Sequence, residues 1–220
     1  MRPNQLRKRL NAGEPSIGTQ VMSPWPGVME MIGHSGCFDY VEFSGEYTAY
    51  DLPMLDDLGR AVDRFDGFSA ILKVDQEPRT FLAQRAIGSG FQNIIFADVR
   101  SADDARECVS AVRAETPKTG GTYGAAGRRF ARFILDGATP EYVQALEDCV
   151  VLLMIEKKEA VENLEEILSV KGVDMVIFGA SDYSMSIGKP GQARSPEITK
   201  VRDHVYSTAL SMGIQPRGEL

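Results

Sequence analysis

The stretch from Val150 to Gly188 constrains the fold of this chain more than any other segment. It opens with the apolar run Val150 to Ile155, continues through a helix-like segment, and reaches a second mostly apolar run, Val173 to Phe178. Within the helix-like segment, apolar residues recur at the spacing of one helix face: Ala160, Val161, Leu164, Ile167 and Leu168. Short apolar runs joined by an amphipathic helix predict a βαβ unit with two buried parallel strands.

An acidic residue follows each of these two predicted strands. Glu156 comes directly after the first strand, and Asp182 lies shortly after the second. Right-handed crossovers bring the carboxyl ends of parallel strands to one edge, so we expect these two carboxylates to lie close together. Facing carboxylates repel at neutral pH unless a positive charge lies between them, and a hard divalent cation commonly supplies it. The alternative is that each acid only caps the next helix; the pair together favours a metal.

The same segment resembles the metal-binding unit of the HpcH/HpaI aldolase family, the class II pyruvate aldolases. In that family one strand ends in I-E, and after a helix a second strand reads V-D-x-V-x-I/F-G-x-x-D-L/Y-S. Here the corresponding residues are Ile155-Glu156, then Val173 to Gly179, then Asp182-Tyr183-Ser184. At lower specificity the similarity extends from about Asn11 to the end of the chain. The resemblance implies a TIM (β/α)8 barrel in which Glu156 and Asp182 bind a divalent metal ion, Mg²⁺, Mn²⁺ or Co²⁺.

Length and composition agree with a single domain spanning residues 1–220. The chain has 220 residues, 43% of them apolar and 25% charged, and it contains no segment typical of an interdomain linker. A net charge of −7 gives no nucleic-acid footprint. No apolar run approaches the roughly 20 residues of a membrane span, and the first residues lack the apolar core of a signal peptide. We therefore expect a cytoplasmic protein without nucleic-acid or membrane partners.

The remaining sequence predicts strands and helices in alternation. Seven strands are expected, beginning at Ser16, Phe38, Phe68, Phe91, Val150, Val173 and Gly213. Helices are expected at Asn4 to Leu10, Gly27 to Ile32, Leu52 to Val62, Pro78 to Ile87, from Ser101 onward, at Glu141 to Leu146 and from Ser195 to Met212. The fold class is thus α/β. The last strand and helix that the resemblance implies are expected to be missing or supplied by a neighbouring subunit.

The loop Ser44-Gly45-Glu46-Tyr47 follows the second predicted strand and partly matches the family's D-G-E-H sequence. In the family, the glutamate helps to hold metal-bound water and the histidine takes part in proton transfer. Glu46 corresponds to that glutamate, whereas Tyr47 stands in place of the histidine. A phenol has an ordinary pKa of about 10, so it serves as a proton donor rather than as a base near neutral pH. Glu46 and Tyr47 are therefore candidate catalytic residues with an altered division of roles.

Lys73, at the end of the third predicted strand, lies near the position of the family's arginine that binds the pyruvoyl oxygens. A lysine keeps the positive charge but loses the planar fork that grips a keto acid through two hydrogen bonds. Lys73 is thus a third candidate catalytic residue, acting on a substrate carboxylate or enolate. The alternative is an ordinary surface lysine at a strand end.

Two further segments are candidates for substrate binding. Thr116 to Ala138 is rich in glycine and basic residues, and in the family this place holds a loop over the active site. Arg128 and Arg129 are therefore candidates for a distal carboxylate or phosphate, with a mobile surface loop as the alternative. The resemblance also implies that the backbone of Gly179, Ala180 and Ser181, which lie in the second half of the motif, holds the substrate carboxylate.

The function that the resemblance implies is cleavage of a 4-hydroxy-2-oxo acid to pyruvate and an aldehyde through a metal-stabilised enolate. A decarboxylase of a 2-oxo diacid would use the same enolate. Two other classes stay open: a catalytically altered relative that acts as a binding or assembly protein, and a metal-free aldolase that forms a Schiff base through Lys73. The resemblance finally implies a homo-oligomer, a trimer or hexamer, whose contacts cover the region from Gly213 to Leu220.

Overall fold

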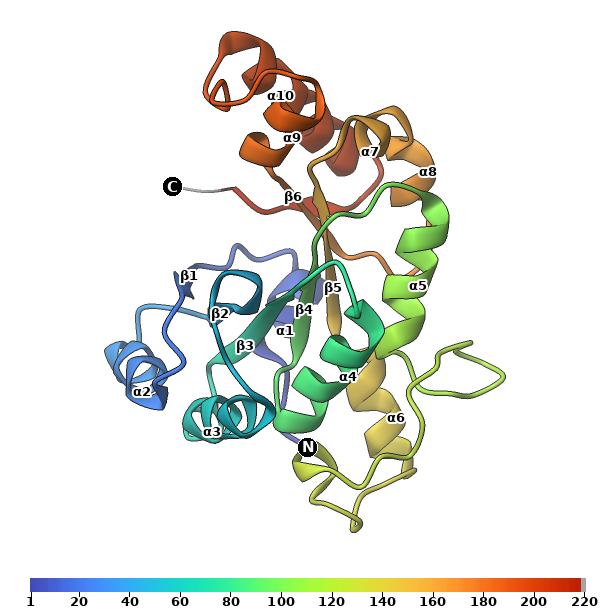
Figure 1. The fold of residues 1–220 in the computed structure, drawn as a ribbon. Coiled ribbons are helices and arrows are strands. Elements are labelled where there is room, and N and C mark those ends of the chain that lie inside the picture. The colour runs from blue at the N-terminus through green and yellow to red at the C-terminus, as the bar shows by residue number, and fades with distance from the viewer. Residues whose placement is uncertain (219–220) are drawn as a thin grey trace. The chain divides into compact units, whose positions relative to one another are not determined.

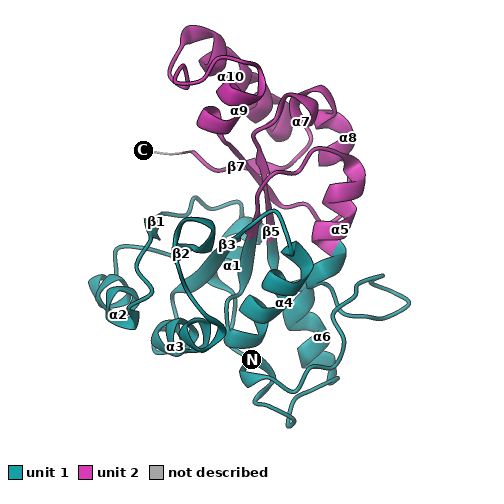
Figure 2. Ribbon diagram, in the orientation of Figure 1, with its two compact units in different colours: residues 1–94, 110–150 teal, residues 95–109, 151–220 magenta. Residues whose placement is uncertain are grey.

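The computed structural model describes residues 1–218 and divides them between two compact units. Unit 1 contains residues 1–94 and 110–150, and unit 2 contains residues 95–109 and the chain from residue 151 onward (Figure 2). The chain therefore passes from unit 1 into unit 2, back into unit 1 and again into unit 2. The single domain expected over residues 1–220 stays a prediction.

Seven strands, coloured from blue to red along the chain in Figure 1, follow one another in the sheet in chain order. They are β1 (Gly18–Val21), β2 (Tyr40–Ser44), β3 (Ser69–Val74), β4 (Asn93–Phe96), β5 (Val150–Ile155), β6 (Met175–Phe178) and β7 (Gln215–Pro216). In unit 1, β2 pairs in parallel with β1 and β3; in unit 2, β6 pairs in parallel with β5 and β7. Parallel strands in chain order with intervening helices are the topology of a TIM barrel. The predicted α/β class and the seven predicted strands are confirmed, and no eighth strand occurs within residues 1–218.

Ten α-helices of the described chain connect or flank these strands. They are α1 (Gln5–Ala12), α2 (Pro26–Ser35), α3 (Leu52–Val62), α4 (Arg79–Ser89), α5 (Ala102–Val112), α6 (Pro140–Glu147), α7 (Lys158–Glu162), α8 (Leu164–Leu168), α9 (Ala180–Ser186) and α10 (Pro196–Ser211). Short 3₁₀ turns occur at η1 (Gly45–Tyr47) and η2 (Arg129–Ala131). Side-chain oxygens of Asp51, Thr139 and Ser195 cap α3, α6 and α10 by accepting from the backbone N–H of the third residue beyond each cap. Within residues 1–218, the structure contains no helix with the length and apolar character of a membrane span.

The core of unit 1 lies on β2 and β3, in which every residue is buried. Helix α1 packs at the amino end of this sheet: Leu6 is fully buried, and the backbone N–H of Gln5 donates to Ser69 Oγ at 2.8 Å. The helix ends at Gly13, whose φ of 66° is the left-handed conformation that glycine adopts at low cost. These contacts hold α1 against the amino end of β3 in unit 1.

Two predicted elements differ from the structure. The single helix expected across residues 160–168 is split into α7 and α8 at Asn163, whose amide donates to the Arg100 carbonyl at 3.1 Å. The predicted buried face is otherwise present, except that Val161 is only partly buried. The fourth strand, expected from Phe91 to Val99, is limited to β4, and the chain turns at Asp98, where φ is 54°.

Candidate active site

The first group of candidate residues, which we call the Lys73 cluster, consists of Glu46, Tyr47 and Lys73 in unit 1. Strand β2 leads directly into η1, which carries Glu46 and Tyr47, and the register of β2 with β3 pairs Ser44 with Lys73. Because the strands are parallel, the loop after β2 and the end of β3 lie at the same edge of the sheet. Sequence reasoning placed all three residues at this edge, and the structure brings them into contact.

The Lys73 ammonium is the centre of this cluster. Its Nζ lies 2.5 Å from Glu46 Oε2 and donates to the Tyr47 hydroxyl at 2.5 Å. It also lies 4.2 Å from the centroid of the Tyr47 ring, a distance at which a cation is attracted to the ring face. Lys73 is only 3% exposed, whereas Tyr47 is 54% exposed. The alternative of an ordinary surface lysine is therefore wrong. Tyr47 is the most exposed member of the cluster, and the Glu46 side chain is 30% exposed.

The surroundings of Lys73 decide its charge. Burial on its own lowers the pKa of Lys73, but the hydrogen bonds and charges of Glu46 and Tyr47 outweigh burial and raise that pKa above its ordinary value. Lys73 is therefore a permanent ammonium at neutral pH. A lysine that forms a Schiff base must first lose this proton, so the cluster disfavours the Schiff-base alternative.

A buried polar chain next to the Lys73 cluster was not predicted. Gln20 Nε2 donates to Ser44 Oγ at 2.6 Å, and Ser44 Oγ donates to Glu42 Oε1 at 2.9 Å. Glu42 is 3% exposed and Ser44 is fully buried. The available signal was a glutamate in the middle of the otherwise apolar strand sequence YVEF, because a buried carboxylate needs hydrogen-bond donors. These bonds fix the end of β2 immediately before η1.

The second group, which we call the Lys157 cluster, consists of Asp98, Glu156, Lys157 and Asp182 in unit 2. Glu156 follows β5 and is 3% exposed, and its Oε1 accepts the backbone N–H of Asp98 at 2.8 Å. The carboxylate also lies directly against Gly179: a Cβ at that position would be 2.6 Å from both Glu156 Cβ and Oε2. Only glycine leaves room for this side chain. The structure thus holds a carboxylate directly after β5, where the sequence predicted it, and that carboxylate is buried.

Asp182 lies in the first turn of α9, and its side chain is 46% exposed. Its Oδ1 accepts a hydrogen bond from Lys157 Nζ at 3.1 Å. The same ammonium lies 3.8 Å from Asp98 Oδ1, and Arg100 donates to both oxygens of Asp98 at 3.1 and 3.2 Å. Burial lowers the pKa of Lys157, but the hydrogen bond to Asp182 and the charges of Asp98, Asp182 and Glu156 raise it overall. The carboxylates of this cluster therefore act together on one cation.

Sequence reasoning missed Asp98 and Lys157. Asp98 lies inside the strand predicted from Phe91 to Val99. Its left-handed backbone cannot be inferred from an apolar pattern. Lys157 sits between a predicted ligand and an amphipathic helix, where a lysine is normally solvent-exposed. A charged residue at a strand end beside a suspected ligand was the only signal.

The donor set of unit 2 fits a hard divalent ion. Among residues 1–218, no group of three or more histidine, cysteine, aspartate or glutamate side chains could hold a metal ion. Glu156 and Asp182 supply two carboxylates, and Mg²⁺ is commonly bound by one or two carboxylates, with water and substrate oxygens completing its coordination. The close packing of Glu156 against Gly179 fixes the position of the Glu156 carboxylate. A two-carboxylate site is therefore compatible with the residues present.

The segments predicted to bind substrate lie in different surroundings. Gly179 precedes α9, Ala180 and Ser181 are its first two residues, and Ser181 is exposed. Arg128 instead donates through Nη1 to the Gln84 carbonyl at 2.7 Å. These observations place the backbone candidates beside the Lys157 cluster and give Arg128 a structural contact within unit 1.

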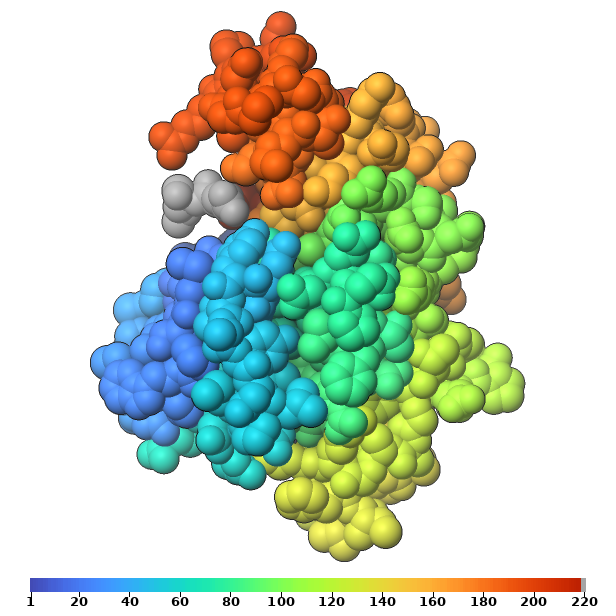
Figure 3. Space-filling model, viewed as in Figure 1, coloured from blue at the N-terminus to red at the C-terminus, as the bar shows by residue number. Residues whose placement is uncertain are grey.

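The glycine-rich loop as a whole remains a surface segment of unit 1. Its yellow-green residues before η2 project from the unit (Figure 3), and η2 itself is anchored to α4. Arg129 donates through Nε to the Ser89 carbonyl at 3.1 Å and forms an ion pair with Asp63. The roles of Arg128 and Arg129 in substrate binding stay predictions.

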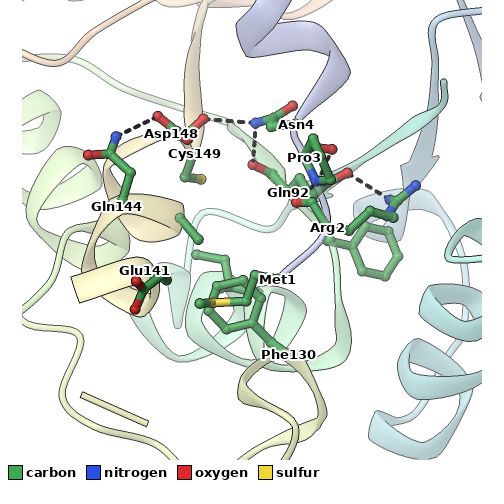
Figure 4. A pocket seen from close by; sticks show the side chains of 13 residues that line it. Met1, Arg2, Pro3, Asn4, Gln92, Phe130, Glu141, Gln144, Asp148 and Cys149 are labelled. Atoms are coloured by element: carbon green, nitrogen blue, oxygen red, sulfur yellow. Dashed lines mark hydrogen bonds between the residues drawn. The ribbon is translucent and has the colours of Figure 1, made fainter. Parts of the chain in front are cut away.

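A pocket of about 260 Å³ lies elsewhere in unit 1. Figure 4 shows Met1, Arg2, Asn4, Gln92 and Asp148 at its wall, with Asn4 Nδ2 donating to the carbonyls of Gln92 and Asp148 at 3.2 and 2.8 Å. Gln92 and Asp148 lie just before β4 and β5, and Met1, Arg2 and Asn4 precede α1. The pocket is therefore at the amino end of the strands, opposite to the edge where TIM-barrel enzymes carry their chemistry.

Comparison with known proteins identifies relatives over the whole chain. The profile of the family described as HpcH/HpaI aldolase/citrate lyase matches residues 56–218. A pyruvate aldolase from Rhizobium etli is 32% identical over 219 residues, which are 99% of this chain and 82% of that protein. A 2-keto-3-deoxy-L-rhamnonate aldolase from Escherichia coli O1:K1 is 32% identical over 199 residues, which are 90% of this chain and 72% of that protein.

A solved structure of a family member has a similar fold. The crystal structure of an HpcH/HpaI aldolase/citrate lyase family protein from Burkholderia cenocepacia J2315 superimposes with a TM-score of 0.87 at 25% sequence identity. The match covers 97% of this chain and 83% of that chain. The predicted family resemblance and the TIM-barrel type of the α/β fold are confirmed.

Proposed function

We propose that this chain, which belongs to the HpcH/HpaI aldolase/citrate lyase family, is a metal-dependent lyase that cleaves a 4-hydroxy-2-oxo acid to pyruvate and an aldehyde. The relatives named as aldolases support a carbon–carbon lyase. The observation that carries the proposal is the carboxylate of Glu156. It is 3% exposed at the end of β5 and packs against Gly179. A buried carboxylate is costly unless it binds a cation or strong donors, so the burial of Glu156 supports a binding role.

Glu156 and Asp182 would hold the divalent ion, Mg²⁺, Mn²⁺ or Co²⁺. When bound, such an ion supplies positive charge at the oxygen where the enolate becomes negative. Glu156 contributes a fixed donor, because the Asp98 N–H holds Oε1 at 2.8 Å. Asp182 contributes an accessible donor, because its side chain is 46% exposed on the first turn of α9. The backbone N–H groups of Ala180 and Ser181 at the start of the same helix would bind the substrate carboxylate.

The Lys73 cluster would supply charge and a proton. The ammonium of Lys73 would attract the carboxylate or enolate oxygen of a 2-oxo acid, and Glu46 keeps that ammonium in place at 2.5 Å. Tyr47 accepts a hydrogen bond from Lys73, and a phenol hydroxyl can both accept and donate a hydrogen bond. In carbon–carbon bond formation the aldehyde oxygen takes up a proton, and we assign Tyr47 as its donor; in cleavage, the reverse step, the proton of the substrate 4-hydroxyl returns to the Tyr47 oxygen as the carbon–carbon bond breaks.

The test is pyruvate release from 2-keto-3-deoxy-L-rhamnonate and related 4-hydroxy-2-oxo acids by chelator-treated protein with and without added Mn²⁺. We expect release that depends on the ion in the wild type. A parallel assay with oxaloacetate measures decarboxylation through the same enolate. Absence of metal-dependent turnover on every 2-oxo acid would favour the binding or assembly protein, and a pyruvate adduct trapped on Lys73 by borohydride would favour the Schiff-base aldolase.

We also propose that the protein is a homo-oligomer, in keeping with the trimer or hexamer expected from the sequence. The interface expected between Gly213 and Leu220 includes β7, a strand of two residues that pairs with β6. Glu219 and Leu220 lie outside the described residues. A strand at the edge of a sheet leaves backbone groups available for a neighbouring chain. Light scattering at micromolar concentration should therefore give a mass above that of one chain, and a monomer with a cooperative melt would contradict the proposal.

A further inference from the structure

We propose that Lys157 is a positioning residue that competes with the divalent ion: its ammonium holds Asp182 in the metal-free protein and withdraws toward Asp98 when the ion binds. This inference rests on the proposed function, because it concerns the metal assigned to Glu156 and Asp182. Lys157 itself is neither a metal ligand nor a catalytic residue in this account. It sets how tightly the ion is bound.

The position of Lys157 is the first step of the argument. The residue directly follows Glu156 and precedes α7, and its side chain is only 18% exposed. Its Nζ donates to Asp182 Oδ1 at 3.1 Å, which is a charge-assisted hydrogen bond to a proposed metal ligand. The ammonium therefore engages one of the oxygens that a divalent ion would need.

Electrostatics gives the second step. A divalent ion bound to Asp182 would lie within a few ångströms of the Lys157 ammonium, and the repulsion between them is twice that between two unit charges at the same distance. The side chain is mostly enclosed, so water screens this repulsion only in part. The ion and the ammonium therefore compete for Asp182, and each weakens the binding of the other by the same factor.

Asp98 gives the third step, because it offers Lys157 a second partner. Asp98 Oδ1 lies 3.8 Å from Lys157 Nζ, just beyond hydrogen-bond distance, and Asp98 is 8% exposed. Arg100 holds both oxygens of Asp98, so this carboxylate stays in place whether or not Lys157 contacts it. A small movement of the lysine head group would exchange Asp182 for Asp98 without leaving the ammonium unpaired.

The matched experiment compares Lys157→Met with Lys158→Met. Both variants remove one lysine charge, but Lys158 is 58% exposed and pairs with Glu162 at 3.5 Å on the surface of α7. Mn²⁺ affinity is measured by calorimetry, and the melting temperature is measured in excess chelator. For Lys157→Met we expect Mn²⁺ to bind about tenfold more tightly, within the usual range of coupling between two sites, and the metal-free protein to melt at a lower temperature. Lys158→Met should change neither quantity appreciably.

Lys157→Arg is the second variant, because it retains the charge and should keep Mn²⁺ affinity near the wild-type value. If Lys157→Met binds Mn²⁺ no more tightly than the wild type, the inference is overturned. Loss of Mn²⁺ binding in Glu156→Gln would then show that the metal assignment still holds. Failure of the wild type itself to bind Mn²⁺ would overturn both. The two failures are therefore distinguished by the wild-type titration alone.

Discussion

The Lys73 cluster and the Lys157 cluster both place a lysine ammonium at the carboxyl ends of parallel strands, but the two ammonium groups have different partners. Lys73 has one carboxylate, Glu46, and one phenol, Tyr47. Lys157 is acted on by the three carboxylates of Asp98, Glu156 and Asp182. Lys73 is almost completely buried, whereas the contact of Lys157 with Asp182 reaches the surface.

This difference indicates how each cluster can respond to a ligand. One ammonium matched by one carboxylate is balanced, so the Lys73 cluster is expected to keep its arrangement and to act through hydrogen bonds. Three carboxylates against the ammonium of Lys157 and the guanidinium of Arg100 leave an excess negative charge, which attracts a further cation. In the proposed reaction, the Lys73 cluster would donate a proton and the Lys157 cluster would hold the divalent ion.

The largest expected effect breaks the cation site. Glu156→Gln keeps the shape of the buried side chain but removes its charge, so we expect loss of detectable Mn²⁺ binding. Turnover should fall by about 10³-fold or more, since a bound ion contributes several kcal/mol to transition-state stabilisation. Calorimetry and the pyruvate-release assay measure the two quantities. Wild-type Mn²⁺ affinity in this variant would show that Glu156 is not a ligand.

The next effect tests the proton donor of the Lys73 cluster. Tyr47→Phe removes only the hydroxyl, and we expect kcat to fall by about 10²-fold while the binding of pyruvate stays near wild type. Steady-state kinetics and a pyruvate titration separate the two outcomes. If binding is lost and kcat is retained, Tyr47 is a packing residue. Tyr47→His, which restores the imidazole of the family pattern, should raise aldol activity.

A smaller effect concerns the packing of Glu156 against Gly179. In Gly179→Ala the new methyl group would collide with Glu156 Cβ and Oε2, both 2.6 Å away, and must displace the carboxylate. Mn²⁺ affinity should therefore fall by about tenfold, in the range of effects for residues that orient ligands. Gly67→Ala is the control, because a Cβ there meets nothing within 4 Å. Equal Mn²⁺ affinities in the two variants would mean that the packing of Glu156 against Gly179 does not affect metal binding.

The smallest effect is the pH dependence of stability from Lys73. Its pKa is raised in the folded protein, so the contribution of the ammonium is complete below the ordinary lysine pKa of about 10.4 and is lost as the pH rises through the raised value. The difference in unfolding free energy between wild type and Lys73→Met should therefore shrink above about pH 10. Urea titrations at several pH values measure it, with the exposed residue Lys8→Met as control. A difference independent of pH would contradict the charge assigned to Lys73.

Much of the fold followed from apolar patterns in the sequence. β5 runs from Val150 to Ile155 and α3 from Leu52 to Val62, the bounds that apolar spacing predicted. The contact of Tyr47 with Lys73 followed from the parallel arrangement, because the loop with Tyr47 follows β2 and Lys73 lies near the end of the neighbouring strand β3. Periodicity reports which face is buried, and for these elements burial decided the structure.

The features that the sequence did not predict depend on specific contacts that leave no periodic pattern in the sequence. Asn163 splits a helix because its amide bonds to the distant Arg100 carbonyl, and Asp98 turns the chain through a left-handed conformation. Lys157 belongs to its cluster because Asp98 and Asp182, from other parts of the chain, lie near its ammonium. Such contacts are set by the folded chain rather than by neighbours in sequence, so single-sequence reasoning identified Glu156 and Asp182 but not the groups around them.

The most direct test of the account is the exchange of the pyruvate methyl protons with deuterium, followed by NMR in D₂O. This exchange requires formation of the enolate and needs no acceptor aldehyde, so it does not depend on the identity of the natural substrate. The account predicts rapid exchange by the wild type with Mn²⁺, none above background in excess chelator, and none in Glu156→Gln with Mn²⁺. Exchange that persists in chelator, or in Glu156→Gln at the wild-type rate, would contradict the metal-dependent enolate chemistry proposed for this protein.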